Sequence, residues 1–185
     1  MVMIAIIFAK KSTRFEKKHS AMICNETMIN RISRILYESS FFTEIILYTK
    51  DSDLNSKYAE TVIDASEGIL INSILECVGK YHEFLAIGGD MPLIDYTLLK
   101  KIIEKYNKKP VTFKNSETYE PLFTLYNMKI YNELKEYVDN GYKSINKFIE
   151  KNDFDIILEN KGDERKLKSV NYFSDLINIR NFLKC

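Results

Sequence analysis

An aspartate follows two glycines at the end of a short apolar run, within residues Phe84–Leu93. The run has the length of a buried strand, and ligands gather beyond the carboxyl ends of parallel strands. A carboxylate at Asp90 can hold Mg²⁺ there, while Gly89 lets a phosphate approach the backbone closely. A plain turn, in which Asp90 accepts hydrogen bonds from nearby N–H groups, explains the same residues. This segment alone leaves both interpretations open.

A second stretch with chemical potential is the polar and basic segment after the first apolar run, residues 9–19. Ser12 and Thr13 offer hydroxyls, Arg14 offers a fork for a phosphate, and Lys17 or Lys18 offers a point charge. Such a loop can grip a nucleotide triphosphate, although a solvated basic loop has the same composition. A Walker loop and a Gly-x-Gly-x-x-Gly pattern are both absent from the sequence, so a nucleotide would be bound by another device.

Composition restricts the class of protein. The chain has 185 residues, with 27 Lys and Arg against 26 Asp and Glu, which gives a net charge of +1. This balance does not favour nucleic acid as a partner. No apolar stretch approaches the roughly 20 residues that span a bilayer, and the first run lacks the flanks of a signal peptide. We therefore expect one cytoplasmic domain over residues 1–185 with no membrane segment.

The cysteines and histidines do not form a metal-binding pattern. Cys24, Cys77 and Cys185 share no metal-ligand spacing, and neither His19 nor His82 has a second ligand nearby in the sequence. The apolar neighbours of Cys24 and Cys77 predict packed thiols rather than ligands. A structural zinc site is therefore not expected.

Short apolar runs alternate with amphipathic segments along the chain. Strands are predicted at Val2–Phe8, Glu44–Tyr48, Thr61–Ile63, Phe84–Ile87, Pro110–Phe113, Leu122–Tyr126, Phe154–Leu158 and Leu167–Val170. Helices are predicted at Thr27–Tyr37, Ile69–Val78, Tyr96–Tyr106, Ile130–Val138, Ser144–Ile149 and Ser174–Leu183. Asp95 and Ser144 are predicted N-caps, and Gly141 a C-cap. The alternation predicts an α/β fold, a three-layer α/β/α arrangement around a mostly parallel, Rossmann-like sheet.

The chain resembles the molybdenum cofactor guanylyltransferase (MobA-like) family of nucleotidyltransferases through four landmarks in the family's order. Ile7–His19 follows in part the family's opening strand and its L-A-G-G-x-S-x-R loop, and Ile87–Pro92 matches its strand ending in C-D-x-P. Pro121–Tyr126 with Gly141–Ser144 matches its P-L-x-x-x-Y segment and G-x-x-S turn, and Ser169–Leu176 matches its closing N-x-N-T-P-E-D-L. The resemblance implies a sheet of the nucleotide-diphospho-sugar transferase type.

The resemblance also implies an activity, which is transfer of GMP from GTP to the phosphate of molybdopterin with release of pyrophosphate. Mg²⁺ would be the cofactor and Asp90 its ligand, with Arg14 and Lys18 acting on the phosphates. A phosphate monoester acceptor is already anionic near pH 7, so no general base is required. Besides GTP and molybdopterin, transient contact with molybdoenzymes or other cofactor-biosynthesis proteins is expected.

By the same resemblance, a set of residues is assigned to nucleotide or acceptor binding. They are Phe8, Ala9, Lys10, Ser12, Thr13, Lys50, Asp64, Gly68, Gly89 and Asn171. Asp64 matches an aspartate on the base and ribose side, and Lys50 falls where the family often carries an Asn. Asn171 would bind the acceptor or complete the metal shell, and its alternative role is to cap the last helix. Pro121 and Leu122 are expected on the acceptor side of the cleft.

The first loop departs from the family pattern. Ungapped alignment places Ala9 and Lys10 at the Gly-Gly pair, Glu16 at a third glycine and His19 at the phosphate-binding lysine. Lys10, Lys11, Lys17 or Lys18 would then have to supply the missing charge from a nearby position. Three readings of the function stay open: GTP with molybdopterin, CTP or another phosphorylated acceptor, and a catalytically silent relative that binds nucleotide or cofactor.

Overall fold

A seven-stranded sheet forms the centre of the protein. The computed structural model describes residues 3–10, 15–66 and 68–185. The strands are β1 Ile4–Ala9, β4 Glu44–Thr49, β5 Glu60–Ile63, β6 Glu83–Gly88, β7 Val111–Lys114, β8 Tyr119–Asn127 and β9 Asp155–Leu158. Their order is β5-β4-β1-β6-β8-β7-β9, and β8 runs antiparallel to both of its neighbours while the other pairs are parallel. The mostly parallel sheet predicted from the alternating pattern is confirmed.

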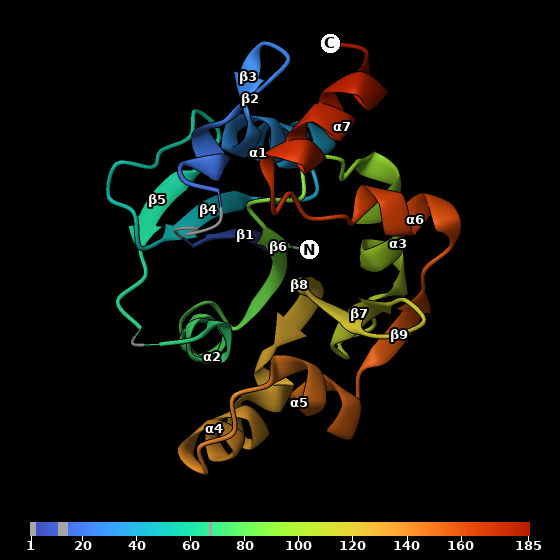
Figure 1. The fold of residues 1–185 in the computed structure, drawn as a ribbon. Helices are drawn as coiled ribbons and strands as arrows, with labels where there is room; N and C mark the ends of the chain where they lie inside the picture. Colours follow the sequence, from blue (N-terminus) through green and yellow to red (C-terminus); the bar gives the residue numbers. More distant parts are fainter. Residues whose placement is uncertain (1–2, 11–14, 67) are drawn as a thin grey trace.

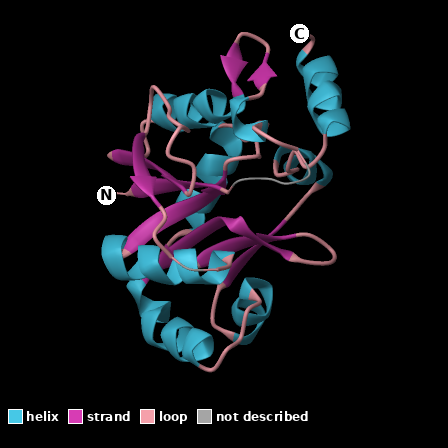
Figure 2. Ribbon diagram, turned by 60° about the vertical axis from the view of Figure 1, so that its left-hand side comes forward, coloured by secondary structure: helices cyan, strands magenta, loops and turns pink. Residues whose placement is uncertain are grey.

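Helices cover both faces of this sheet, which confirms the three-layer arrangement (Figure 1 and Figure 2). One face carries α1 Met28–Ser39, α3 Tyr96–Lys105 and α7 Phe173–Leu183. The other face carries α2 Leu70–Tyr81, α4 Tyr131–Asp139 and α5 Ile145–Lys151. A short helix, α6 Lys161–Lys166, lies beside α3, where the Lys101 ammonium is 2.6 Å from the Asp163 carboxylate.

Central strand β1 supplies side chains to a hydrophobic core on each face. Ala5, Ile7 and Ala9 join the core under α1 and α3, whereas Ile6 and Phe8 join the core under α2 and α5. Side chains of a strand alternate between faces, so a strand buried on both faces reads as a continuous apolar run. The first run of the sequence has that form for this reason.

The predicted helix caps are largely confirmed. Asp95 accepts a hydrogen bond from the Leu98 N–H at 3.1 Å, and Ser144 accepts one from the Lys147 N–H at 3.3 Å. Asn140 is the C-cap of α4, and Gly141 follows it with a φ of 81°, a conformation that glycine adopts without strain.

Two expectations about local structure are wrong, and one element was not predicted. Leu167–Val170 is not a strand, because Leu167 ends α6 and its N–H bonds back to Asp163. The segment before α1 forms a small hairpin of β2 Met22–Ile23 and β3 Glu26–Thr27 that periodicity did not indicate. Cys24 is not a packed thiol; it lies exposed in the turn of this hairpin and forms a disulfide with Cys185.

Cys77 is buried with a free thiol, as predicted for a packed cysteine. None of the helices formed by the described residues has the length and apolar character that crossing a membrane requires.

Candidate functional site

The candidate site lies at the carboxyl ends of two neighbouring parallel strands, β1 and β6. Phe8 and Gly88 are register partners, and the next N–H, that of Gly89, donates to the Phe8 carbonyl at 2.9 Å. A Cβ atom at Gly89 would lie 3.0 Å from the Ala9 Cβ and 3.2 Å from the Phe8 carbonyl oxygen. Glycine is therefore needed here because two backbones approach closely.

The chain places Lys18 and Asp90, two of the predicted catalytic residues, in direct contact. Lys18 begins the 3₁₀ helix η1 Lys18–Ser20, and its Nζ lies 2.5 Å from Asp90 Oδ2. Both side chains are largely buried, with 9% and 17% of their surface exposed. The Lys18 ammonium also reaches the Val170 carbonyl at 3.4 Å, and the Val170 N–H donates to the Asp90 carbonyl at 2.8 Å. Asp90 is thus held from two sides.

His19 has a different role from the one that ungapped alignment gave it. Its buried ring lies between two carbonyl oxygens, that of Gly89 at 2.8 Å from Nδ1 and that of Lys10 at 2.9 Å from Nε2. The ring therefore joins the start of the first loop to the Asp90 loop. The cation that faces Asp90 is Lys18, so the neighbouring lysine fills the position for which alignment named His19.

Four of the residues assigned to nucleotide binding meet beyond the ends of β4 and β5. The Lys10 ammonium reaches the Gly68 carbonyl at 3.4 Å, and the Lys50 ammonium donates to the Ser66 carbonyl. Burial lowers the pKa of Lys10, the Asp64 carboxylate opposes this effect and the Lys50 charge adds to it. The first loop and the loop after β5 are therefore connected through lysine side chains, next to the Lys18–Asp90 pair.

The Asp64 carboxylate is engaged within the protein. It is 6% exposed and accepts hydrogen bonds from the Ser66 N–H at 2.9 Å, the Ser66 hydroxyl and the Ser73 hydroxyl at 2.8 Å. Burial alone would raise the pKa of Asp64, but these hydrogen bonds hold it below its ordinary value. Asp64 fixes the loop after β5 in this structure, and its contact with ribose or base stays a prediction.

The remaining site predictions fall in different places. Phe8 and Ala9 have core side chains, and the Ala9 carbonyl accepts a bond from the Thr49 hydroxyl at 2.7 Å. Asn171 follows Val170 and so lies next to the Asp90 loop. Asn171 does not cap the last helix, because the N-cap is Tyr172. The Asp175 carboxylate accepts hydrogen bonds from the N–H groups of Asn171 and Tyr172.

Arg14, Ser12 and Thr13 lie outside the described residues, so their predicted roles at the phosphates stay predictions. The described neighbours of that segment, Lys10 and Lys18, both face the site.

The residues present fit a magnesium ion with a small protein shell. Mg²⁺ commonly takes one or two carboxylates, with waters and substrate phosphates completing its six ligands. No group of three or more His, Cys, Asp or Glu within ligand distance exists in the described part of the chain. Asp90 is a carboxylate of the kind that such an ion takes, and nucleotide phosphates and water would have to supply its other ligands.

Sequence reasoning missed the residues that support the Asp90 loop through backbone contacts. The Arg31 Nε donates to the Pro92 carbonyl at 2.9 Å. The Val170 N–H binds the Asp90 carbonyl, and the His19 ring binds the Gly89 carbonyl. These bonds join segments far apart in the sequence, so no local spacing indicates them.

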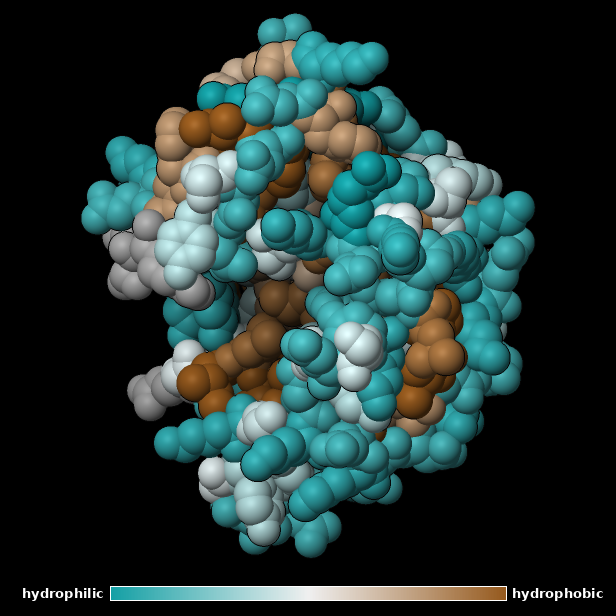
Figure 3. Space-filling view, turned by 45° about the vertical axis from the view of Figure 1, so that its right-hand side comes forward, coloured by the Kyte–Doolittle hydropathy of each residue, from teal (hydrophilic) through white to brown (hydrophobic). Residues whose placement is uncertain are grey.

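In Figure 3 the surface is hollowed between its upper and lower halves, and hydrophobic side chains line the hollow.

Comparison with known proteins gives one family and one fold. Residues 4–155 match the model of the MobA-like NTP transferase domain. No curated protein matches the sequence.

Three of the similar solved structures illustrate the likeness. The molybdopterin-guanine dinucleotide biosynthesis protein A of Archaeoglobus fulgidus is 18% identical, with 99% of each chain covered and a TM-score of 0.77. A 4-diphosphocytidyl-2C-methyl-D-erythritol synthase of Anaerococcus prevotii is 14% identical, with 100% of this chain and 97% of that chain covered and a TM-score of 0.74. A protein of Aquifex aeolicus is 19% identical, with 92% and 94% covered and a TM-score of 0.69. Identities this low show the fold alone, the nucleotide-diphospho-sugar transferase type that was predicted.

Proposed function

The chain belongs to the family of MobA-like NTP transferase domains, and from this premise we propose that it transfers GMP from GTP to molybdopterin and releases pyrophosphate. The general class, a nucleotidyltransferase-type domain, follows from the family. The nucleotide and the acceptor are the proposed part. We further propose that the reaction takes place in the cytoplasm, with transient contacts to molybdoenzymes or other cofactor-biosynthesis proteins.

The observation that carries the proposal is the Lys18–Asp90 pair at the carboxyl ends of β1 and β6. A cation and a carboxylate at this edge are the two groups that a phosphoryl-transfer site needs, one for a phosphate and one for a metal ion. The glycine beside them, Gly89, is required by close backbone packing. The site therefore has both charges, Lys18 from the first loop and Asp90 from the loop after β6, although the first loop lacks the family's glycines.

In this proposal the protein acts mainly by placing charges. The Lys18 ammonium binds a phosphate of the nucleotide in exchange for its contact with Asp90, while the Val170 carbonyl still holds it. Lys10 and Lys50 lie on the neighbouring loops and bind the nucleoside side together with the Gly68 backbone. The acceptor phosphate attacks as an anion, so no side chain has to remove a proton.

Asp90 would hold Mg²⁺, with nucleotide phosphates and water as the other ligands. When bound, the ion neutralises charge on the reacting phosphate and on the leaving pyrophosphate. Asn171 follows Val170, whose N–H binds the Asp90 carbonyl, and we propose that Asn171 contacts the acceptor.

The direct test is an assay of the full chain with Mg²⁺, molybdopterin and each of the four NTPs in turn, with pyrophosphate release as the readout. We expect release with GTP. Asp90→Ala should lower the rate by about 100-fold or more, because one metal-binding or charge-stabilising group commonly contributes that much. The change also leaves the largely buried Lys18 ammonium without its carboxylate, so the melting temperature should fall by several degrees, and the rates are compared at a temperature at which both proteins are folded.

Asp139→Ala is the matched control, because Asp139 is an exposed aspartate at the end of α4, a helix that contributes no residue to the site. It should retain full activity. Release with CTP alone would favour a cytidylyl transfer, and no release with any NTP would leave a silent relative. If Asp90→Ala keeps full turnover, the mechanism is wrong.

A further inference from the structure

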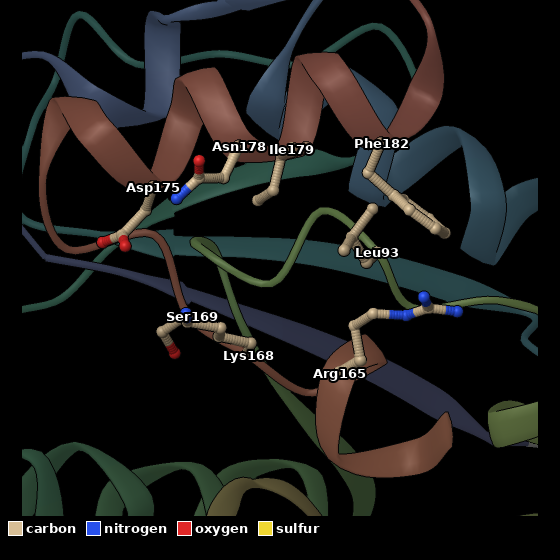
Figure 4. Close-up of a pocket in the computed structure, with 8 residues that line it drawn as sticks. All are labelled: Leu93, Arg165, Lys168, Ser169, Asp175, Asn178, Ile179 and Phe182. Atoms are coloured by element: carbon tan, nitrogen blue, oxygen red, sulfur yellow. The ribbon is translucent and has the colours of Figure 1, made fainter. Parts of the chain in front are cut away.

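A second cavity lies behind the Asp90 loop, between α6, α7 and Leu93, with a volume of about 200 Å³ (Figure 4). We propose that this cavity binds an organic anion that carries one flat ring, at a site separate from the nucleotide site. Ile179 and Phe182 point from α7 toward Leu93 and Arg165, so the cavity has an apolar wall and a cationic rim.

The apolar wall suits a flat ring. Phe182 is 48% exposed, so its ring is accessible from the cavity. The Arg165 guanidinium lies 4.2 Å from the centre of its ring. A guanidinium that rests on an aromatic face stays planar and keeps its N–H donors free at the edge, where they can bind an anion. One aromatic ring against Phe182 would be covered on one side and anchored by Arg165.

The charges around the cavity point to an anion. Two lysines near α6 do not line the cavity, and each is paired with a carboxylate. The Lys166 ammonium lies 2.5 Å from Asp95, and the Lys101 ammonium lies 2.6 Å from Asp163. Arg165 and Lys168 line the cavity, and neither lies at ion-pair distance from a carboxylate of the described residues.

One carboxylate, Asp175, also lines the cavity, but it is engaged in hydrogen bonds to the backbone at the start of α7. It accepts the N–H groups of Asn171 and Tyr172, both at 2.9 Å. Burial opposes the ionised form of Asp175, but these bonds and the Lys168 charge keep its pKa below the ordinary value. With Arg165 and Lys168 against this one carboxylate, the rim keeps an excess of positive charge. An uncharged ring would leave that excess uncompensated.

Position and size separate this cavity from the nucleotide site. Its lining residues other than Leu93 follow residue 155, the last residue matched by the family model. A volume of about 200 Å³ is below the range of about 300–1,000 Å³ typical of drug-sized ligands, so the cavity suits a small ligand with one ring. The cavity nevertheless adjoins the Asp90 loop, since Ser169 precedes Val170, whose N–H binds the Asp90 carbonyl.

The test is calorimetric titration of the full-length protein with four probes: phenyl phosphate, benzoate, benzyl alcohol and inorganic phosphate. We expect one or both aromatic anions to bind, and the neutral alcohol and free phosphate to bind at least about tenfold more weakly. Phenyl phosphate and benzoate differ in their anionic group, so their order of affinity identifies the natural class. Equal binding of the alcohol, equal binding of free phosphate, or no binding of any probe would each overturn the proposal.

Variants tie the binding to this cavity. Arg165→Gln and Phe182→Leu should each weaken the aromatic anion about fivefold or more. Lys161→Gln is the matched control, because Lys161 is an exposed cation of the same helix that does not line the cavity. Lys50 lies on the nucleotide side, where it contacts the Ser66 carbonyl, and Lys50→Gln should also leave this affinity unchanged. If Lys50→Gln or saturating Mg-GTP abolishes binding, the probe occupies the nucleotide site and the proposal fails.

Discussion

The Lys18–Asp90 contact combines two groups that are costly to bury alone. An ionised side chain removed from water is stable only when it is paired or hydrogen-bonded. Lys18 satisfies Asp90 and also reaches the Val170 carbonyl, so the pair holds both the first loop and the C-terminal segment. A nucleotide phosphate that binds Lys18, and a metal ion that binds Asp90, would each replace one half of this pair.

We expect Lys18→Gln to reduce pyrophosphate release by on the order of 100-fold or more, because it removes a fixed charge from the phosphates. Lys17→Gln should change the rate by less than about twofold, since Lys17 is exposed and adjacent in sequence. Steady-state kinetics of both variants, each checked by thermal unfolding, distinguish the two lysines. Equal losses would mean that only the overall charge of the loop matters.

Two further carboxyl groups have unusual titration behaviour. Burial, together with the Glu159 charge, raises the pKa of Glu120 to about 7. Burial and the charges of Glu164 and Asp163 raise the pKa of Glu159 to about 7. Glu159 Oε1 is also buried without a hydrogen-bond partner among the residues described. A carboxyl whose pKa is raised on folding favours the folded state only while it is protonated.

The free energy of unfolding should therefore fall as the pH rises from about 4.5 to about 7, the ordinary and the raised pKa of Glu120. Glu120→Gln imitates the protonated form and should recover on the order of 1 kcal/mol at pH 8 and much less at pH 5, after allowance for solvent screening. Urea unfolding at the two pH values measures this. Glu117→Gln, an exposed neighbour, is the control. An equal gain at both pH values would contradict the assigned cause.

At the residue scale, the sequence was sufficient where a side chain follows a strand directly. Asp90 could be placed at the edge of the sheet because Gly88–Gly89 ends a buried run, and Lys18 could be named because a cation was needed nearby. The partners Val170, Arg31 and His19 could not, because they reach the loop through backbone carbonyls and N–H groups of distant segments. Backbone partners leave no residue-type signal.

At the scale of elements, periodicity found the strands and helices that bury a face, since burial is what creates the pattern. It missed α6, whose sequence Lys161–Lys166 has no apolar face and is held instead by a capping box between Asn160 and Asp163. It also produced a false strand at Leu167–Val170. Leu167 and Val170 are both buried, but in an irregular segment rather than a ladder.

The start of α3 allows a test of one element's stability. Asp95 caps the helix, and its second oxygen lies 2.5 Å from the Lys166 ammonium. Asp95→Ala should lower the free energy of unfolding by about 1–2 kcal/mol, mostly through the lost cap. Asp95→Asn keeps a capping oxygen and loses the ion pair, so it should cost about 0.5 kcal/mol or less. Chemical denaturation that gives equal losses for both variants would assign the effect to the ion pair instead.

At the scale of the whole molecule, the end of the chain is fastened to the segment that carries Lys18. Four contacts join the two segments. They are the ring pair Phe15–Phe173, the Lys18 bond to Val170, the Arg180 fork on the Met22 carbonyl and the disulfide Cys24–Cys185. Residues 170–185 therefore act as a clamp on the first loop, and Figure 1 shows the C-terminus beside the β2–β3 hairpin.

The disulfide should provide a large part of this clamp's contribution to stability. It joins residues 161 positions apart, and closing a loop of that length stabilises a folded chain by up to about 5 kcal/mol in the chain-entropy model. We expect Cys185→Ser to lower the melting temperature by about 5–15 °C, and Cys24→Ser to have the same effect because it breaks the same bond. A dithiol reductant should lower the melting temperature of the wild type toward that of the variants. It should not change the melting temperature of Cys185→Ser, because that variant has no disulfide left to reduce and Cys77 is already a thiol. Titration of the thiols in the denatured, unreduced wild type should find one, that of Cys77. Three thiols would contradict this account, because the disulfide would then be absent.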